Sequence, residues 1–290
     1  MSLQAFYHLN VAYQRQLSFQ HYDGAFSYFR SDWDYSSKSV WLTAFCARIL
    51  AEANFNEWEN YLYIDPGVIA KAVDWMIQFQ SPEGAFYEVS NSTYADRKMN
   101  STTSWGFNDP IRQRNISLTA HVVIALTTIR DLPGELGPRV AVARSRAISW
   151  LDRNLNLLDR NGDPYEIAIT AYAMMLAKST SAEAAFGLLR RHAREEGGYI
   201  YWGKQPVPLP AQRLENQRPF LLPRLPNQFD AANVETTAYA LLTYVGRQEL
   251  FVEPIVKWIN TQRLTDGGWA STQDTIIATQ VPLFVPKIQS

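Results

Sequence analysis

The sequence predicts an all-α protein, an α/α toroid in which buried inner helices alternate with amphipathic outer helices. Three observations predict this fold: a recurring glycine motif, a recurring threonine motif downstream of it, and the near absence of segments typical of strands. The glycine motif has the form acidic–Gly–small–aromatic and occurs at residues 23–26, 83–86, 196–199 and 266–269. The threonine motif is Thr-Ala followed by an aromatic residue or histidine, and occurs at residues 43–45, 119–121, 170–172 and 237–239.

The segments around the threonine motifs are the predicted inner helices. WLTAFCARILAEA and LTAHVVIALTTI, for example, carry apolar or small residues on nearly all sides. A helix that is apolar all round is a buried helix, so we expect these segments to pack on one another. Residues 272–280 begin in the same manner after the last glycine motif.

The segments that precede the glycine motifs are the predicted outer helices. Residues 65–80, 139–155 and 253–263 show a one-sided apolar stripe and a charged face, a pattern typical of a helix with one wet side. Five alternations of outer and inner helix are readable. A helical solenoid would alternate in the same way, but one face of each inner helix would line an open groove. Uniformly apolar inner helices therefore favour the toroid.

The glycines have a local cause, because a helix ends best at a residue that tolerates the left-handed conformation. The aromatic residue of each glycine motif is expected to pack back over the end of the helical hairpin. We therefore assign Trp269, the aromatic residue of the last motif, a structural role rather than a ligand contact.

Composition limits the possible functions. The 290 residues are 47% hydrophobic and carry a formal net charge of −1, which indicates a large core and excludes a disordered chain. The near-neutral charge gives no reason to expect nucleic acid or an anionic membrane as the main partner. No stretch approaches the ~20 consecutive apolar residues that span a bilayer, so we expect no membrane insertion.

Cysteine use and glycosylation sequons bear on the compartment. Cys46 is the one cysteine, so no internal disulfide can form. Asn91, Asn100 and Asn115 each begin an N-x-[ST] sequon within one polar stretch, which favours a secretory history and predicts glycosylation at these asparagines. Chance sequons in a polar surface loop are the alternative. The sequons lead us to expect an extracellular, secreted protein. The N-terminal residues lack the features of a signal peptide, so we expect this chain to be part of a longer precursor.

Several stretches resemble the thioester domain of the alpha-2-macroglobulin and complement family. Residues 13–45 are similar to the family's "GYQRQL" helix, its Asp-Gly-Ser-Phe corner and its "STWLTAF" segment. The resemblance continues in order through residues 64–86, 117–126 and 255–278 and is weakest over residues 203–229. It covers most of the chain and implies a toroid of helical hairpins, the fold that the repeats also predict.

The resemblance implies a role in protease inhibition or innate immune recognition, with other domains of a larger parent protein and with proteases or microbial and cell surfaces as partners. The family's reactive group is a thioester between the Cys and Gln side chains of a Cys-Gly-Glu-Gln motif. That motif does not occur in this sequence, and Cys46 is followed by Ala47. We expect Cys46 to be a core residue, and we expect no enzyme activity, catalytic residue, cofactor or metal.

The resemblance also raises the question of a reactive histidine, because some family members use a histidine as an acyl acceptor. Residues 87–117, where it would be expected, contain none. His121 follows on an inner helix and is expected to be a core residue, whereas His8, His21 and His192 lie on or beside outer helices and are expected to be exposed.

Two interpretations within the family stay open. The chain is either the part of a thioester domain that follows the reactive motif, or a member of a branch whose thioester is degenerate. The insect macroglobulin complement-related proteins, close to the thioester-containing proteins, are such a branch. They would give the chain a non-covalent scaffold role at cell surfaces or junctions.

A toroid enzyme is the rival class. Residues 262–269 echo the Gln…Gly-x-Trp motif of terpene cyclases and prenyltransferases, and Asp32-Trp33-Asp34 is the nearest approach to a cyclase's acidic motif. Glycosidases of this fold bring carboxylates together at the N-termini of inner helices. Capping of those N-termini is the interpretation that we favour for such carboxylates here. They belong to Glu166, Glu235, Asp274 and, just before a helix, Asp230.

The ends and one insertion complete the predicted organisation. We expect residues 1–281 to form one toroid domain that lacks its first inner helix, and residues 282–290 to form an irregular tail. Pro282 and Pro286 cut the last inner helix short, so the toroid is expected to be incomplete at both ends and to expose apolar surface. Residues 203–229 hold six of the 15 prolines and are predicted to form a surface loop that contacts a neighbouring domain or partner.

Overall fold

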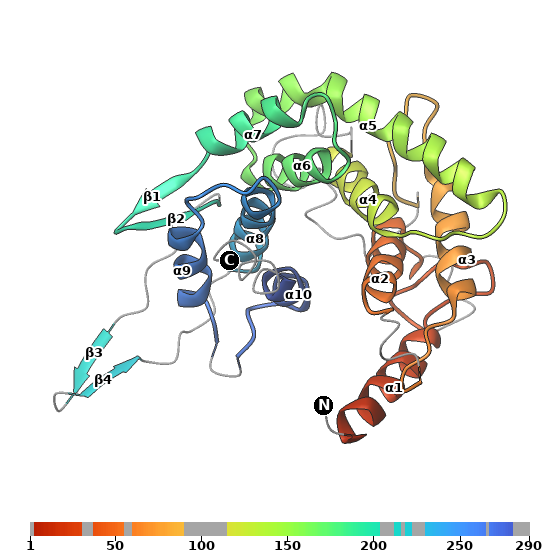
Figure 1. Ribbon diagram of the computed structural model, residues 1–290, viewed down its shortest axis with the longest axis horizontal. Helices are drawn as coiled ribbons and strands as arrows, with labels where there is room; N and C mark the ends of the chain where they lie inside the picture. The colour runs from red at the N-terminus through yellow and green to blue at the C-terminus, as the bar shows by residue number, and fades with distance from the viewer. Residues whose placement is uncertain are drawn as a thin grey trace. The chain divides into compact units, whose positions relative to one another are not determined.

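The protein divides into two compact units, residues 1–154 and 155–290, whose helices and strands are labelled in Figure 1. The computed structural model describes the greater part of both. The prediction of one toroid domain over residues 1–281 stays a prediction. The described residues are 3–30, 37–54, 60–89, 115–203, 212–215, 218–221, 230–264 and 267–280.

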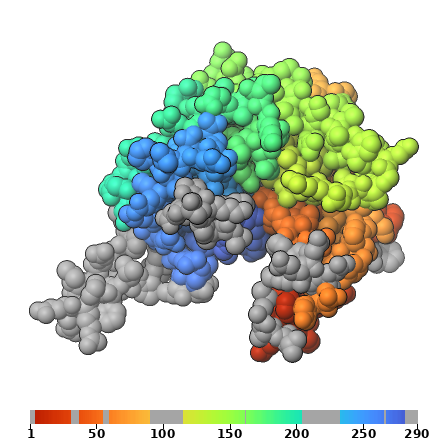
Figure 2. Space-filling view, in the orientation of Figure 1, coloured from red at the N-terminus to blue at the C-terminus, as the bar shows by residue number. Residues whose placement is uncertain are grey.

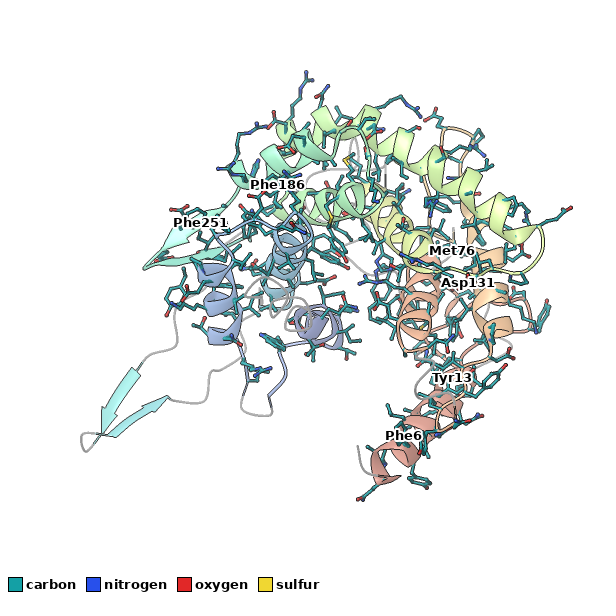
Figure 3. All side chains as sticks on the ribbon, in the orientation of Figure 1. Phe6, Tyr13, Met76, Asp131, Phe186 and Phe251 are labelled. Atoms are coloured by element: carbon teal, nitrogen blue, oxygen red, sulfur yellow. The ribbon has the colours of Figure 1, made fainter. Side chains whose placement is uncertain are left out.

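The first unit is built from helices. Inner helix α2 packs on inner helix α4 and on outer helix α3, and α5 begins in this unit and continues past its boundary. Helix α1 is anchored through Tyr13 (Figure 3), whose hydroxyl oxygen accepts a hydrogen bond from the Asp65 backbone N–H at 3.0 Å. In chain order the elements are α1 (Leu3–Leu17), α2 (Val40–Glu52), α3 (Pro66–Met76), the 3-10 helix η3 (Ile77–Phe79), α4 (Ile116–Thr128) and α5 (Leu136–Asn161).

The second unit repeats this arrangement. Inner helix α8 packs on inner helices α6 and α10, α7 packs on α6, and α9 packs on α8 and β2. The helices are α6 (Pro164–Leu176), α7 (Ala182–Arg191), α8 (Asp230–Gly246), α9 (Glu253–Thr261) and α10 (Thr272–Gln280). Two short antiparallel hairpins join them, β1 (Arg194–Glu196) with β2 (Tyr199–Tyr201), and β3 (Gln212–Glu215) with β4 (Arg218–Leu221).

Burial distinguishes inner helix α4 from outer helix α9, as predicted. All residues from Ile116 to Leu126 on α4 are buried, whereas α9 buries one side and pairs Lys257 with Glu253 on the other at 2.6 Å. Side chains of α5 lie at the surface in the space-filling view (Figure 2). The five predicted alternations are therefore α1 with α2, α3 with α4, α5 with α6, α7 with α8 and α9 with α10. The all-α fold class is confirmed, and the closed ring stays a prediction.

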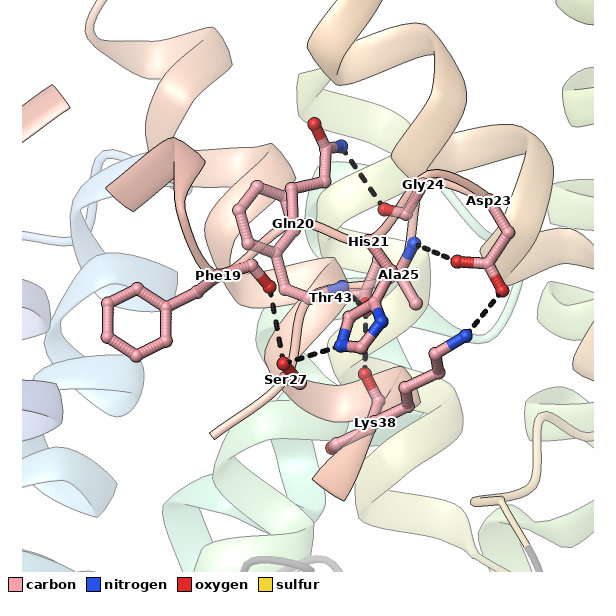
Figure 4. A network of polar contacts seen from close by, with 11 residues as sticks. Phe19, Gln20, His21, Asp23, Gly24, Ala25, Ser27, Lys38 and Thr43 are labelled. Atoms are coloured by element: carbon pink, nitrogen blue, oxygen red, sulfur yellow. Dashed lines mark hydrogen bonds and ion pairs between the residues drawn. The ribbon is translucent and has the colours of Figure 1, made fainter. Parts of the chain in front are cut away.

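The first two glycine motifs form tight corners of one design. We call residues 20–26 the first corner and residues 80–86 the second. In the first corner the Gly24 N–H donates to the His21 carbonyl at 3.0 Å and the His21 N–H donates to the Ala25 carbonyl at 2.8 Å (Figure 4). Gly24 has φ +101°, a conformation that side-chain-bearing residues rarely adopt, so glycine is required there.

Three of the four threonine motifs are bonded to a residue of the preceding connection, which explains why the two motifs occur together. In these three, and at Thr275 of α10, the threonine hydroxyl accepts a hydrogen bond from the backbone N–H of an aromatic residue before the inner helix, and we call this bond the corner lock. The bond joins the end of an outer helix to the start of the next inner helix. The locks are Phe26 to Thr43 at 2.9 Å, and Phe86 to Thr119, Trp202 to Thr237 and Trp269 to Thr275, each at 3.0 Å.

The third glycine motif does not form a corner of this kind. The prediction that its aromatic residue, Tyr199, packs over the end of the helical hairpin is wrong. Gly197 and Gly198 have φ values of +57° and +81°, as the two-residue turn between β1 and β2 requires. The hairpin moves the chain on by three residues, so Trp202, rather than Tyr199, makes the corner lock. Trp202 is fully buried and its indole N–H donates to the Leu189 carbonyl at 2.8 Å, whereas Tyr199 is partly exposed.

The threonine of the α6 motif provides an internal control for the corner lock. Thr170 follows a direct α5–α6 connection instead of a corner, and within the described part of the chain its buried hydroxyl has no hydrogen-bond partner. Thr119→Val removes the acceptor of the buried Phe86 N–H and is expected to lower the free energy of unfolding by about 1–3 kcal/mol. Thr170→Val is expected to be neutral or slightly stabilising. Urea denaturation of both variants measures the difference, and equal effects would contradict the role of the lock.

Candidate functional site

Cys46 lies inside the first unit rather than at a reactive surface. It is on α2 with 7% of its surface exposed, and the Gln16 side-chain amide donates to Sγ at 3.3 Å. Burial raises the pKa of the Cys46 thiol to about 12, because the thiolate would lose its hydration. Thiolate is the nucleophilic form. The prediction of a core cysteine is confirmed, and this residue is unsuited to hold or attack an acyl group.

The raised pKa leads to a labelling prediction. We expect the folded protein to react negligibly with iodoacetamide at pH 7–8, and to react fully after unfolding in guanidinium chloride. The pKa of the thiol is higher in the folded than in the unfolded protein, so ionisation of Cys46 opposes folding. The free energy of unfolding should therefore be unaffected by Cys46 below about pH 8.5 and should fall as pH rises from about 8.5 towards 12. Mass spectrometry of the Cys46 peptide measures the labelling, and fast reaction in the folded state would contradict its burial.

Three of the histidines test the sequence predictions directly. His121 on α4 is buried, its ring centroid lies 5.7 Å from that of Trp41, and its Nε2 lies 3.3 Å from the Trp41 carbonyl oxygen. The core assignment is therefore confirmed, as is the exposure of His8. The exposure predicted for His21 is wrong. The first corner covers the His21 side chain, and only 6% of the surface of this residue is exposed.

His21 and Ser27 have the composition of a base and a nucleophile but the wrong hydrogen bonds for catalysis (Figure 4). His21 Nε2 lies 2.8 Å from Ser27 Oγ, and that hydroxyl donates to the Phe29 carbonyl at 2.6 Å. The Phe19 carbonyl oxygen lies 3.3 Å from the same hydroxyl, so the serine proton has two carbonyl acceptors besides the imidazole, and the shortest contact is to a carbonyl. Ser27 is also buried. The pair holds the first corner together and does not activate a nucleophile.

The carboxylates at the inner-helix N-termini are held by their own neighbours. Asp274 Oδ1 accepts from the Ser271 N–H at 2.8 Å and from its hydroxyl at 2.9 Å, while Ser271 Oγ accepts from the Asp274 N–H at 3.4 Å. This reciprocal arrangement is a capping box, so the capping interpretation is confirmed for Asp274. Glu235 is buried and accepts from the Tyr165 hydroxyl at 3.1 Å.

The other candidate residues for an enzyme gain no support. Glu166 is buried in the first turn of α6. Asp32, Trp33 and Asp34 lie outside the described residues, as does the side chain of Asp230. In the described part of the chain no group of three or more His, Cys, Asp and Glu side chains is placed to hold a metal ion.

Glu88 is a structurally important residue that sequence reasoning missed. Its carboxylate accepts from the Ser39 hydroxyl at 2.9 Å and from the backbone N–H groups of Val40 at 2.5 Å and Trp41 at 3.2 Å. A carboxylate at this position satisfies the free donors at the start of α2 and complements the helix dipole. Glu88 is 49 residues from Ser39 in sequence, so no local pattern could have identified it.

Of the three predicted glycosylation sites, only Asn115 lies in the described residues. Asn115 is the residue before α4, with left-handed φ 51° and ψ 40°. It is partly exposed, and it lines a cleft of about 570 Å³ together with Tyr87, Trp150, Arg153 and others. Ile116 and Ser117, the rest of its sequon, are buried. Asn91 and Asn100 lie outside the described residues, and glycosylation of all three stays a prediction.

The fold and these sites define a class: an all-α domain of alternating inner and outer helices whose described candidate nucleophiles are buried and engaged. No described helix has the length and apolarity needed to cross a membrane. The family model of the A-macroglobulin TED domain matches residues 1–281. Complement C3 of Oncorhynchus mykiss is 27% identical, and the match covers 94% of this chain and 14% of that protein.

The chain therefore belongs to the A-macroglobulin TED domain family. This confirms the resemblance seen in the sequence. The chain spans about one seventh of the length of the complement C3 that it matches, so it corresponds to one domain of that larger protein.

Proposed function

We propose that this chain acts as a thioester-type domain of a larger extracellular protein in protease inhibition or innate immune recognition, and that its own contribution is a non-covalent surface. The observation that carries the proposal is the family match over residues 1–281. The similarity to a protein named complement C3 supports the immune side of it.

The non-covalent part of the proposal rests on the sequence and on two sites. The chain contains no Cys-Gly-Glu-Gln motif, Cys46 is buried with a raised pKa, and the Ser27 hydroxyl donates to a carbonyl. These 290 residues would therefore contribute shape and polar surface to partner recognition, and no acyl group of their own. We propose no turnover and no cofactor for this chain.

Secretion and glycosylation belong to the same proposal. Three sequons in one stretch support passage through the secretory pathway. Ser117 and Ile116 are buried in the first turn of α4, so a glycan on Asn115 would have to be attached before this unit folds. The proposed partners are the other domains of the parent protein, together with proteases or microbial and cell surfaces.

Detection of the natural protein tests its size, location and glycosylation. Antibodies raised against the chain should recognise a polypeptide much longer than 290 residues in extracellular fluid. Removal of N-glycans in heavy-oxygen water should convert Asn91, Asn100 and Asn115 to labelled aspartate, which peptide mass spectrometry detects. A polypeptide of 290 residues found inside cells, without glycans, would overturn the proposal.

Activity of the purified parent protein separates the two roles. A protease inhibitor that works by enclosure should block an endopeptidase from large protein substrates while small peptide substrates are still cleaved. A recognition protein should bind microbial surfaces. Release by denaturant is the outcome expected for a parent protein without a Cys-Gly-Glu-Gln motif, and retention through denaturant is the outcome expected for one that carries the motif outside these 290 residues. A cell-junction scaffold, the alternative suggested by the missing motif, should do neither and should fractionate with cell contacts.

A further inference from the structure

Three exposed arginines of helix α5 follow one another at intervals of seven residues. They are Arg139, Arg146 and Arg153, and all three belong to the first unit. Seven residues make almost two turns of an α-helix, so each arginine lies about 20° around α5 from the one before it and about 10.5 Å further along. The three arginines therefore form a row along one side of α5, which we call the arginine stripe.

Backbone carbonyls of the second corner hold two of these side chains in place. Arg146 Nη2 donates to the Ser81 carbonyl at 3.2 Å and to the Pro82 carbonyl at 2.7 Å. Arg153 Nη2 donates to the Glu83 carbonyl at 2.9 Å. A neutral carbonyl orients a guanidinium without cancelling its charge, and the Nε and Nη1 donors of both arginines form no hydrogen bond or ion pair with a described residue. Both guanidinium groups are therefore positioned in advance to bind an anion.

Within the described part of the chain, one ion pair opposes the charge of the stripe. Arg139 Nη1 lies 2.7 Å from Asp74 Oδ1 of α3, and about half of each side chain is exposed. An exposed pair of this kind contributes little stability, so Arg139 can exchange Asp74 for another anion at small cost. Glu83 lies beside Arg153 in the cleft described above but forms no ion pair with it. The stripe thus keeps a positive charge, although the whole chain has a formal net charge of −1.

Two clefts lie against the stripe and are lined by groups that suit a sugar. One has a volume of about 400 Å³ and is lined by Arg139 and Arg146 together with the exposed amide side chain of Gln78. The other is the cleft of about 570 Å³ described above, which is lined by Arg153 and by Tyr87, a residue that is 42% exposed. A sugar ring packs its C–H groups on an exposed aromatic face and bonds through its hydroxyls to polar side chains. The surroundings of the arginines therefore favour a saccharide over a simple anion.

We propose that the arginine stripe and its two clefts bind a sulfated polysaccharide chain of cell surfaces. This rests on the proposed function, in which the chain works outside the cell and takes part in surface recognition. Guanidinium groups bind sulfate oxygens through paired hydrogen bonds. A row one residue wide follows a single linear polymer, whereas an anionic bilayer presents its charges over a plane. Because the net charge of the chain is near zero, general attraction to polyanions is weak and binding depends on this stripe.

A heparin octasaccharide with a fluorescent label is the probe for the full 290-residue chain. Fluorescence anisotropy in about 0.15 M NaCl should show saturable binding with a Kd below about 100 μM. Binding should weaken at least about tenfold in about 0.5 M NaCl, because salt screens the attraction between guanidinium and sulfate. The same octasaccharide with its sulfate groups removed should bind at least about tenfold more weakly, because it lacks the anions that the arginines recognise.

Substitutions on α5 locate the binding at the stripe. Arg146→Gln and Arg153→Gln should each weaken binding of the probe at least about threefold, and glutamine keeps an amide that can donate to the corner carbonyls. Arg144→Gln is the matched control. It removes the same charge from the same helix, but Arg144 lies at least about 140° around α5 from the stripe, so the affinity should change less than about 1.5-fold. Urea denaturation verifies that each variant is folded.

Asp74→Asn should increase the affinity, a gain that a folding defect would not produce. The substitution frees Arg139 from its ion pair and should tighten binding of the probe about two- to fivefold. Glu253→Gln is the matched control, because it removes the same charge and frees Lys257 from another exposed ion pair, on α9. This control should leave the affinity for the octasaccharide unchanged.

Other polyanions distinguish a sugar chain from phosphate-bearing partners. A DNA duplex of about equal charge and vesicles that contain phosphatidylserine should each bind at least about tenfold more weakly than the octasaccharide, because neither presents sugar rings to the clefts. Tyr87→Ala should weaken binding of the octasaccharide about threefold without changing its salt dependence, since it removes a ring contact and no charge. Tighter binding of DNA or vesicles than of the octasaccharide would contradict the assignment of a polysaccharide.

The outcomes separate this proposal from the proposed function. Absence of saturable octasaccharide binding below about 100 μM, equal effects of Arg153→Gln and Arg144→Gln, or no gain with Asp74→Asn would each overturn the polysaccharide site. None of them bears on the size, location or glycosylation of the parent protein, by which the proposed function stands or fails.

Discussion

Gly84→Ala is expected to lower the free energy of unfolding by about 3–5 kcal/mol, from two separate causes. Gly84 has φ +113°, where an alanine side chain is strained against its own backbone. A Cβ at this position would also overlap the Arg146 carbonyl and lie 3.2 Å from the Trp150 Cβ. Because the overlapped atom is helix backbone, the second corner and α5 would have to separate. Urea denaturation followed by tryptophan fluorescence measures the loss.

Gly187→Ala is the matched control for that substitution. Gly187 lies inside α7 and no described atom is within 4 Å of its Cβ position, so alanine should raise stability by about 0.5–1 kcal/mol through its better helix propensity. The two substitutions add the same methyl group and are expected to change stability in opposite directions. A Gly84→Ala variant within about 1 kcal/mol of the unsubstituted protein would contradict the close contact with α5.

Trp202→Ala is the other substitution with a large expected effect, a fall of about 3–5 kcal/mol in the free energy of unfolding. The side chain is fully buried between elements of the second unit, and its indole N–H donates to the Leu189 carbonyl at the end of α7. Removing it leaves a large cavity and loosens the corner lock, which the Trp202 backbone N–H forms with Thr237. Thermal or urea denaturation reports this loss.

Tyr199→Ala distinguishes the structure from the sequence pattern. The glycine motif assigns the packing role to Tyr199, whereas the structure assigns it to Trp202 three residues later. Because Tyr199 is partly exposed, its substitution by alanine should lower the free energy of unfolding by about 1 kcal/mol or less. If Tyr199→Ala proved the more destabilising of the two, the β1–β2 hairpin register and the assignment of Trp202 would both be wrong.

The order of helices and their inner or outer character could be predicted because both depend on local patterns. A helix such as α4, apolar all round, has one stable environment, and a one-sided helix such as α9 has another. The glycine of the first two corners was also predictable, because only a flexible backbone suits the turn. Burial of Cys46 and His121 followed from their place on inner helices.

The contacts that hold the helices in place depend on residues far apart in the chain, and these were not predictable. Glu88 reaches the start of α2, and the threonine hydroxyls reach corners that precede them by many residues. His21 was misplaced because the sequence shows that it follows an outer helix but not that the corner folds over it. The motif EGGY resembles DGAF in letters, yet two consecutive glycines with positive φ form a hairpin turn instead.

The corner lock has a consequence for how this domain can vary. The bond closes chain segments of very different length. Its two partners are 6 residues apart for Trp269 and Thr275, but 33 residues apart for Phe86 and Thr119 and 35 for Trp202 and Thr237. Loop-closure entropy grows only with the logarithm of length, so this range costs less than about 2 kcal/mol. Sequence can therefore be inserted between corner and inner helix at little cost to the fold. These positions suit the grafting of binding loops onto an unchanged helical framework.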